Sequence, residues 1–117
     1  MTDISVVLPV HNQADHIAEI VPDYVAALSK VPRSYELLLV TNACKDNSTQ
    51  ICKSLSEQYE QVRTIDTRYG GWGLSVKLGL NAAKGEILCY TNSARTSSEI
   101  LVLVLLYAIA YPRVVIK

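Results

Sequence analysis

The sequence has no net charge, its first residues do not resemble a signal peptide, and it contains no apolar run long enough to cross a membrane. Lysine plus arginine and aspartate plus glutamate number 11 each in the 117 residues. Without an excess of basic residues the chain has no positive electrostatic potential that would attract nucleic acid, so we expect no nucleic-acid partner. The first apolar run, Ile4–Val10, is too short for a signal peptide and no basic segment precedes it. We therefore expect a cytoplasmic protein, with peripheral association at the inner face of the membrane as an alternative.

Cysteine is also sparse. Cys44, Cys52 and Cys89 form an odd set without tight spacing, which argues against a disulfide framework. No CxxC pair is present, and His11 and His16 are distant in sequence, so a zinc site is not expected. We expect three reduced thiols in the core or in loops.

What the sequence does contain is apolar residues, which make up 50% of the chain. They form continuous runs rich in Val, Ile and Leu, a pattern typical of parallel strands covered on both faces. The expected strands are Ile4–Leu8, Glu36–Thr41, Val62–Thr67, Glu86–Thr91 and Arg113–Lys117. Helical segments alternate with these runs, so the fold class is α/β. We expect one three-layer α/β/α domain over residues 1–117, with a mostly parallel, Rossmann-like sheet and the first strand central.

Four helices should separate these strands. They are expected over Ala14–Ser29, after Asp46-Asn47-Ser48, over Leu74–Ala83 and over Ser98–Tyr111. Pro22 lies inside the first and predicts a kink or a break there. The cluster of good N-caps at 46–48 precedes the second, and Gly85 offers a stop for the third. The fourth is apolar almost all round and is shorter than the about 20 residues that span a bilayer. We expect it to be a buried packing helix, with uncovered surface that promotes self-association.

In open α/β sheets, ligands bind beyond the carboxyl ends of the strands. A dinucleotide site would need GxGxxG after the first strand and an acid at the end of the second. Here the first turn, Pro9–Gln13, contains no glycine, and the second strand ends in Thr41-Asn42 without an acid. The pair Gly71-x-Gly73 follows the third strand instead. The sequence therefore argues against NAD.

Four segments resemble, in register along the whole chain, motifs of the family 2 glycosyltransferases with the GT-A fold. The family's P-x-Y-N-E loop falls on Pro9-Val10-His11-Asn12-Gln13, which keeps Pro and Asn, and its D-D-G-S-T-D falls on Thr41–Asp46, which keeps the last Asp. The family block G-K-G-A-A-x-N-x-G-x-x-x-A-x-G-D falls on Gly71–Glu86 and keeps its glycines at 71, 73, 79 and 85. The D-x-D motif falls on Thr91-Asn92-Ser93.

This resemblance implies a site for a nucleoside diphosphate sugar and an unidentified acceptor. In the family, the first two motifs hold uridine or guanosine, while D-x-D binds the ribose and a Mg²⁺ or Mn²⁺ on the diphosphate. The nucleotide-sugar-binding residues that follow by position, together with a nearby arginine, are Pro9, His11, Gln13, Asn42, Gly71, Trp72, Thr91, Asn92, Ser93 and Arg95.

The acidic residues of the family motifs are largely missing. The residues at 13, 41, 42, 91 and 93 keep a hydrogen-bonding group where the family has a carboxylate. Hard divalent ions need carboxylate oxygens, so we expect no metal cofactor at Thr91–Ser93. Arg95 could then pair directly with the diphosphate, with Arg68 and Lys77 as further candidates.

Several of these residues also have a structural explanation. Gly79 and Gly85 are best explained by close packing of helix and sheet, whereas the other two glycines of the block also allow a ligand to approach. Trp72 either stacks on a base or sugar or anchors its loop, and His11 either stacks or packs at the helix entry. Asp46 is better explained as a helix N-cap than as a catalytic group.

Two functions stay open from the sequence. The first is the nucleotide-sugar-binding part of a glycosyltransferase, metal-independent or weakly active. The alternative is a non-catalytic, degenerate binding or assembly module on the same fold. In the resembled family the acceptor half follows the D-x-D strand and the next one, so we expect an N-terminal fragment that is inactive alone. The sequence identifies neither donor, acceptor, stereochemistry nor catalytic base.

Overall fold

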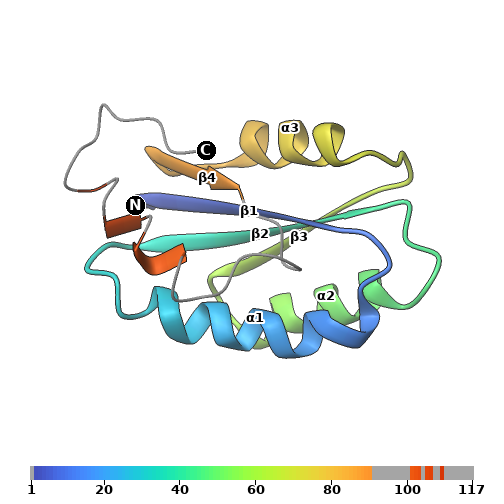
Figure 1. The fold of residues 1–117 in the computed structure, drawn as a ribbon, viewed down its shortest axis with the longest axis horizontal. Coiled ribbons are helices and arrows are strands. Elements are labelled where there is room, and N and C mark those ends of the chain that lie inside the picture. The colour runs from blue at the N-terminus through green and yellow to red at the C-terminus, as the bar shows by residue number, and fades with distance from the viewer. Residues whose placement is uncertain (1, 91–100, 104, 107–108, 110–117) are drawn as a thin grey trace.

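Strands and helices alternate along the described chain, because continuous apolar runs are separated by amphipathic ones. The computed structural model describes residues 2–90, 101–103, 105, 106 and 109 (Figure 1). The elements are β1 (Ile4–Val10), α1 (Ala14–Leu28), β2 (Tyr35–Asn42), α2 (Ser48–Gln58), β3 (Val62–Thr67), α3 (Trp72–Ala82) and β4 (Ile87–Tyr90). The fifth strand expected at 113–117 lies outside the described residues.

All strand pairs of the described sheet are parallel, in the order β3-β2-β1-β4. The expected α/β class and the central position of β1 are therefore confirmed. All residues of β1 are buried, as are those of β2 after Tyr35. β3 and β4 lie at the edges of the described sheet and are only partly buried.

The helices form two layers on opposite faces of the sheet, α1 and α2 on one and α3 on the other (Figure 1). The larger core lies on the α1 side and includes Ile17, Tyr24 and Leu28. A smaller core of Val7, Leu38 and Val40 contacts partly buried side chains of α3. Both faces are thus covered, as the continuous apolar strands predict.

Helix α1 runs unbroken through Pro22, so the break expected at this residue is absent. A proline inside a helix costs about 3 kcal/mol. The stripe of Ile17, Val21, Tyr24 and Leu28 is buried against the sheet, and each such side chain contributes about 1.5–3 kcal/mol. Packing of the helix face therefore outweighs the missing hydrogen bond.

The ends of the other helices differ from the sequence expectations. The cap position of α2 is Asn47, one residue after Asp46, and its own side chain makes no capping bond. Helix α3 begins at Trp72 and ends at Ala82, three residues before Gly85. Gly85 is therefore not the helix stop. A Cβ there would lie 2.8 Å from the backbone of Ile4 and Ser5, so its role is close approach to β1.

Part of the fourth expected helix is described. Residues 101–103, 105, 106 and 109 are helical. Leu101 and Leu105 are buried in the larger core, as expected of a packing helix, whereas Leu103 and Leu106 are exposed. Within the described residues, no helix has the length and apolarity that a membrane crossing requires.

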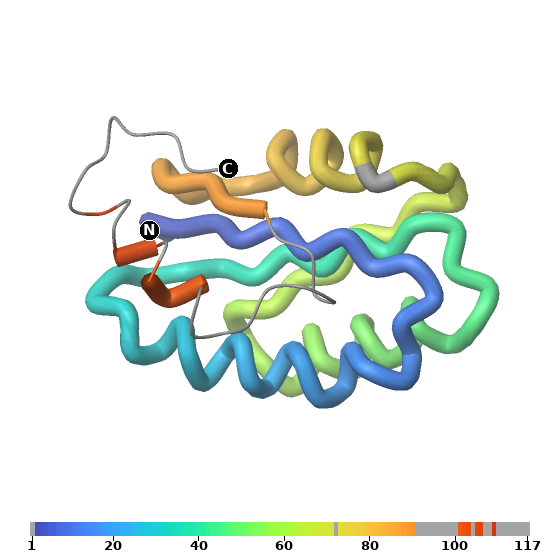
Figure 2. The backbone as a smooth tube through the Cα atoms, in the orientation of Figure 1, coloured from blue at the N-terminus to red at the C-terminus, as the bar shows by residue number. Residues whose placement is uncertain are grey.

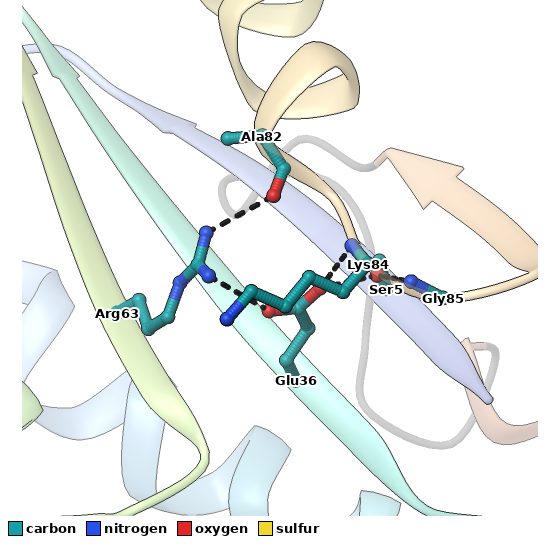
Figure 3. Close-up of polar contacts among 6 residues, drawn as sticks. All are labelled: Ser5, Glu36, Arg63, Ala82, Lys84 and Gly85. Carbon is teal, nitrogen blue, oxygen red and sulfur yellow. Dashed lines mark hydrogen bonds and ion pairs between the residues drawn. The ribbon is translucent and has the colours of Figure 1, made fainter. Parts of the chain in front are cut away.

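A buried polar cluster joins the amino ends of the strands to the α3–β4 connection (Figure 3). Glu36 Oε2 accepts hydrogen bonds from Ser5 Oγ at 2.6 Å and from the Lys84 backbone N–H at 2.7 Å. Its Oε1 lies 3.5 Å from Arg63 Nη1, and Arg63 Nη2 donates to the Ala82 carbonyl at 3.1 Å. This cluster, which we call the Glu36 cluster, satisfies polar groups that the end of α3 and the following turn would leave buried.

Candidate functional site

The loops after β1, β2 and β3 gather at one end of the sheet, opposite the Glu36 cluster (Figure 2). An open cavity of about 540 Å³ lies there, where β2 and β3 end. It is lined by Ala43, Cys44, Lys45, Asp46, Asn47, Thr49, Gln50, Asp66, Thr67 and Arg68. Its size is within the range of small-molecule sites, and its place is where open α/β sheets bind ligands.

Asp46 ties the first turns of two helices to this cavity. Its Oδ1 accepts hydrogen bonds from the Ser48 backbone N–H at 3.0 Å and from Ser48 Oγ at 2.6 Å. Its Oδ2 accepts a hydrogen bond at 3.2 Å from the backbone N–H of Ala14, the first residue of α1. The Ser48 hydroxyl and N–H are the main reason that the pKa of Asp46 lies below its usual value. Asp46 thus caps the start of α2, as expected, although it lies one position before the cap residue Asn47.

Two residues of these loops hold a backbone conformation that side chains rarely adopt. Asn12 has φ 48° and Ala43 has φ 46°. Asn12 tolerates this conformation, and its Oδ1 accepts the Lys45 N–H at 2.7 Å. Ala43, which occupies the glycine position of the D-D-G-S-T-D pattern, has no such side-chain bond and costs about 1 kcal/mol. The loop after β1 therefore fixes the loop after β2 in a strained shape.

His11 and Asn42 join the same two loops. His11 Nδ1 lies 2.7 Å from the Asn42 carbonyl oxygen, and because a carbonyl only accepts, Nδ1 carries the proton. Nε2 then accepts from Asn12 Nδ2 at 3.3 Å. The buried Asn42 side chain donates to the Val10 carbonyl at 3.1 Å. Both side chains thus hold β1 and β2 together at this edge.

The charged side chains at the cavity fall into two kinds. Lys45 and Arg68 form no ion pair within the described part of the chain, and the Arg68 guanidinium lies 5.5 Å from the centre of the Tyr69 ring. Asp66 is an exposed carboxylate whose Oδ1 accepts a hydrogen bond from Thr41 Oγ1 at 2.7 Å. The cavity therefore offers cations for an anionic group and a hydrogen-bond acceptor on a neighbouring strand.

The residues predicted from the sequence are brought together only in part. Pro9 is buried inside β1, opposite Val40 of β2. The Gln13 backbone N–H donates to Ser48 Oγ at 2.8 Å. Gly71 is exposed, has φ 122° and precedes α3, whose first residue is Trp72. Thr91, Asn92, Ser93 and Arg95 lie outside the described residues.

Among the further candidates, Arg68 lines the cavity, whereas Lys77 lies on the exposed surface of α3. Sequence reasoning missed Lys45, Thr49 and Asp66. The available signal was their position, in the loop after β2, in the first turn of α2 or at the end of β3, where ligands of this fold class bind.

The three cysteines are free, as expected. Burial raises the pKa of Cys52 to about 12 and that of Cys89 to about 11, so both stay protonated at neutral pH. Cys44 Sγ lies 3.4 Å from the Val10 carbonyl and helps to line the cavity.

Asp46→Asn should change the acid sensitivity of the fold. A carboxylate with a lowered pKa stabilises the native state above its unfolded pKa of about 3.9, and this contribution is lost as the pH falls through the lower folded value. We therefore expect the wild type to be more stable than the variant at pH 7 and to lose that advantage below about pH 4. Urea unfolding at several pH values measures it.

The matched control is Asp23→Asn, which removes an exposed carboxylate from the middle of α1. This variant should follow the wild type across the same pH series. A constant difference between Asp46→Asn and wild type from pH 7 to pH 3 would contradict the assigned role.

Among the described residues, few carboxylate oxygens of the cavity are open to a divalent metal. Among the described residues, no group of three or more His, Cys, Asp or Glu side chains is placed to hold an ion. Both oxygens of Asp46 accept hydrogen bonds, and the sequence at 91–93 offers hydroxyl and amide groups but no carboxylate. Hard cations require carboxylate-rich oxygen ligands.

The sequence model of the family described as glycosyl transferase family 2 matches residues 5–94. Glycosyltransferase GlyG of Streptococcus pneumoniae is 31% identical over 91 residues, which are 77% of this chain and 29% of GlyG. The chain thus covers less than a third of this relative.

Solved structures share the fold. S. aureus TarS in complex with UDP aligns with a TM-score of 0.69 at 18% identity, over 94% of this chain and 33% of that one. Mannosyltransferase PcManGT from Pyrobaculum calidifontis, in complex with GDP-Man and Mn²⁺, aligns with a TM-score of 0.69 at 15% identity, over 92% of this chain and 34% of its own. At these identities the likeness concerns the fold.

Proposed function

The chain belongs to glycosyl transferase family 2, and we propose that it is the nucleotide-sugar-binding part of an enzyme that transfers a sugar from a nucleoside diphosphate sugar to an acceptor. The observation that carries this proposal is the cavity at the carboxyl ends of β2 and β3, with Lys45 and Arg68 beside it. Fold neighbours with UDP or GDP-Man bound support the ligand class.

Lys45 and Arg68 are the cavity residues that would meet the diphosphate of such a donor. When the bond between the sugar and the diphosphate breaks, negative charge grows on the leaving phosphate oxygen. Cations that are fixed before the reaction stabilise that charge without reorganisation. Lys45 acts as a point charge, whereas the guanidinium of Arg68 can bind two phosphate oxygens at once. Arg95, which follows the T-x-S segment in sequence, is a third candidate for this role.

The position of Lys45 depends on the loop after β1. Asn12 Oδ1 accepts the Lys45 N–H, and Asp46, the next residue, is held against α1 and α2. A ligand at the cavity thus meets a loop that is already ordered, which lowers the entropic cost of binding.

We also propose that this binding is independent of a metal, because the donor set does not suit one. The test is calorimetric titration of the full-length protein with UDP and GDP, in EDTA and in Mg²⁺ or Mn²⁺. We expect equal affinity in all three conditions. Arg68→Ala and Arg95→Ala should each weaken binding about tenfold, since a hydrogen bond to a charged group contributes about 1.5–3 kcal/mol.

The control is Lys53→Ala, which removes an exposed cation of α2 that does not line the cavity. It should leave the affinity unchanged. A strict metal requirement would overturn the metal-independent role of the cations. If the full-length protein bound neither nucleotide, the non-catalytic module would be the better explanation.

Self-association and contact with a membrane surface stay predictions. Exposed apolar side chains occur on α3, on β4 and in the segment at 101–106, the largest exposed fraction being 66% at Leu103. Such surface suits association, and light scattering of the isolated chain would measure it.

A further inference from the structure

The inference concerns Asp66 and the kind of base that the cavity accepts. Asp66 lies on β3 directly opposite Thr41 of β2 in the parallel register. Its Oδ1 accepts a hydrogen bond from Thr41 Oγ1 at 2.7 Å, and Thr49 Oγ1 lies 3.4 Å from the same oxygen. The buried Thr41 side chain therefore holds the carboxylate in one orientation at the cavity wall.

The second oxygen of Asp66 differs from the other acidic oxygens of the cavity. Within the described residues, Asp66 Oδ2 accepts no hydrogen bond and Asp66 forms no ion pair. Asp46, the other acid of the lining, uses one oxygen for Ser48 and the other for Ala14. Asp66 is thus the carboxylate of the cavity that keeps an acceptor for a ligand.

No acid stands at the end of β2 itself, where Thr41 and Asn42 are found. Asp66, on the neighbouring strand β3, brings a carboxylate next to the carboxyl end of β2. Lys45 and Arg68 line the same cavity and are not paired with it. A ligand that satisfies all three residues carries an anionic group and, apart from it, an N–H donor.

We propose that Asp66 selects the base of the donor nucleotide by accepting the ring N–H next to a carbonyl, which is N3–H of uracil or N1–H of guanine. This inference rests on the proposed nucleotide-sugar function. Cytosine N3 and adenine N1 are acceptors, so their lone pairs would face the carboxylate. A site built around a hydrogen bond discriminates strongly against a ligand that leaves it unmade.

The experiment is a set of titrations of the full-length protein with UDP, GDP, CDP and ADP. We expect UDP to bind at least about tenfold more tightly than CDP, or GDP at least about tenfold more tightly than ADP. Which of UDP and GDP binds more tightly shows whether the site prefers uracil or guanine. Asp66→Asn keeps the size of the side chain but adds an N–H₂ that can donate to cytosine N3 or adenine N1. This variant should reduce the ratio of the affinities for UDP and CDP, or for GDP and ADP, about tenfold.

Two further variants separate base selection from folding. Asp66→Glu keeps a carboxylate and should keep the preference, and Asp23→Asn should change nothing. If Asp66→Asn does not fold by circular dichroism, Thr41→Val, which removes the hydroxyl that orients the carboxylate, must lower the same ratio severalfold.

The outcomes are distinguishable. If the nucleotides bind but the ratio is the same in wild type and Asp66→Asn, the inference fails and the proposed function stands. If none of the four binds to the wild type, both fail.

Discussion

Glu36→Ala is expected to destabilise the fold by about 3 kcal/mol, because it removes the acceptor at the centre of the Glu36 cluster. Ser5 Oγ and the Lys84 N–H would lose their partner, and each unsatisfied buried group costs about 1–3 kcal/mol. The Arg63 side chain is 34% exposed, so water compensates part of the loss of its ion pair. The expected destabilisation therefore lies at the lower end of the range for broken buried ion pairs. Urea unfolding at pH 7 measures the change.

Glu36→Gln keeps an acceptor oxygen and the shape of the side chain, so about half of the loss is expected. Glu57→Ala is the matched control, since it removes an exposed carboxylate from α2 and should change stability by less than about 0.5 kcal/mol. A loss below about 1 kcal/mol for Glu36→Ala would show that the cluster is not a major support of the fold.

The sequence predicted the order of the elements because the apolar pattern of each segment is local. Val62–Thr67 was predicted with the bounds that β3 has. β1 and β2 extend further than expected, to Val10 and Asn42, because backbone pairing between neighbouring strands continues past Leu8 and Thr41. Pro9, within β1, is an example of tertiary pairing that overrides local propensity.

The contacts that shape the candidate site could not be predicted in this way. Asp66 meets Thr41 only when the register of β2 and β3 is known. Asp46 reaches Ala14 across 32 positions of sequence, and Glu36 reaches Lys84 across 48. The resemblance in the motifs predicted a site at the carboxyl edge of the sheet, whereas the residues that line the cavity at this edge follow from the strand pairing.

Gly79→Ala and Gly73→Ala should have opposite effects although both lie in α3. A Cβ at Gly79 would collide with the side chain of Val7, which is fully buried in β1, and overpacking costs about 1–3 kcal/mol. After the gain in helix propensity, of about 1 kcal/mol, the variant should still lose up to about 2 kcal/mol. At Gly73 nothing lies within 4 Å of an added Cβ, so the same change should stabilise the fold by less than about 1 kcal/mol. Thermal unfolding of both variants tests the pair.

Because α3 begins directly after the exposed Gly71 loop, a shift of this helix away from β1 would also move that loop at the carboxyl edge. Equal effects of the two substitutions would mean that close contact with Val7 does not set the position of α3.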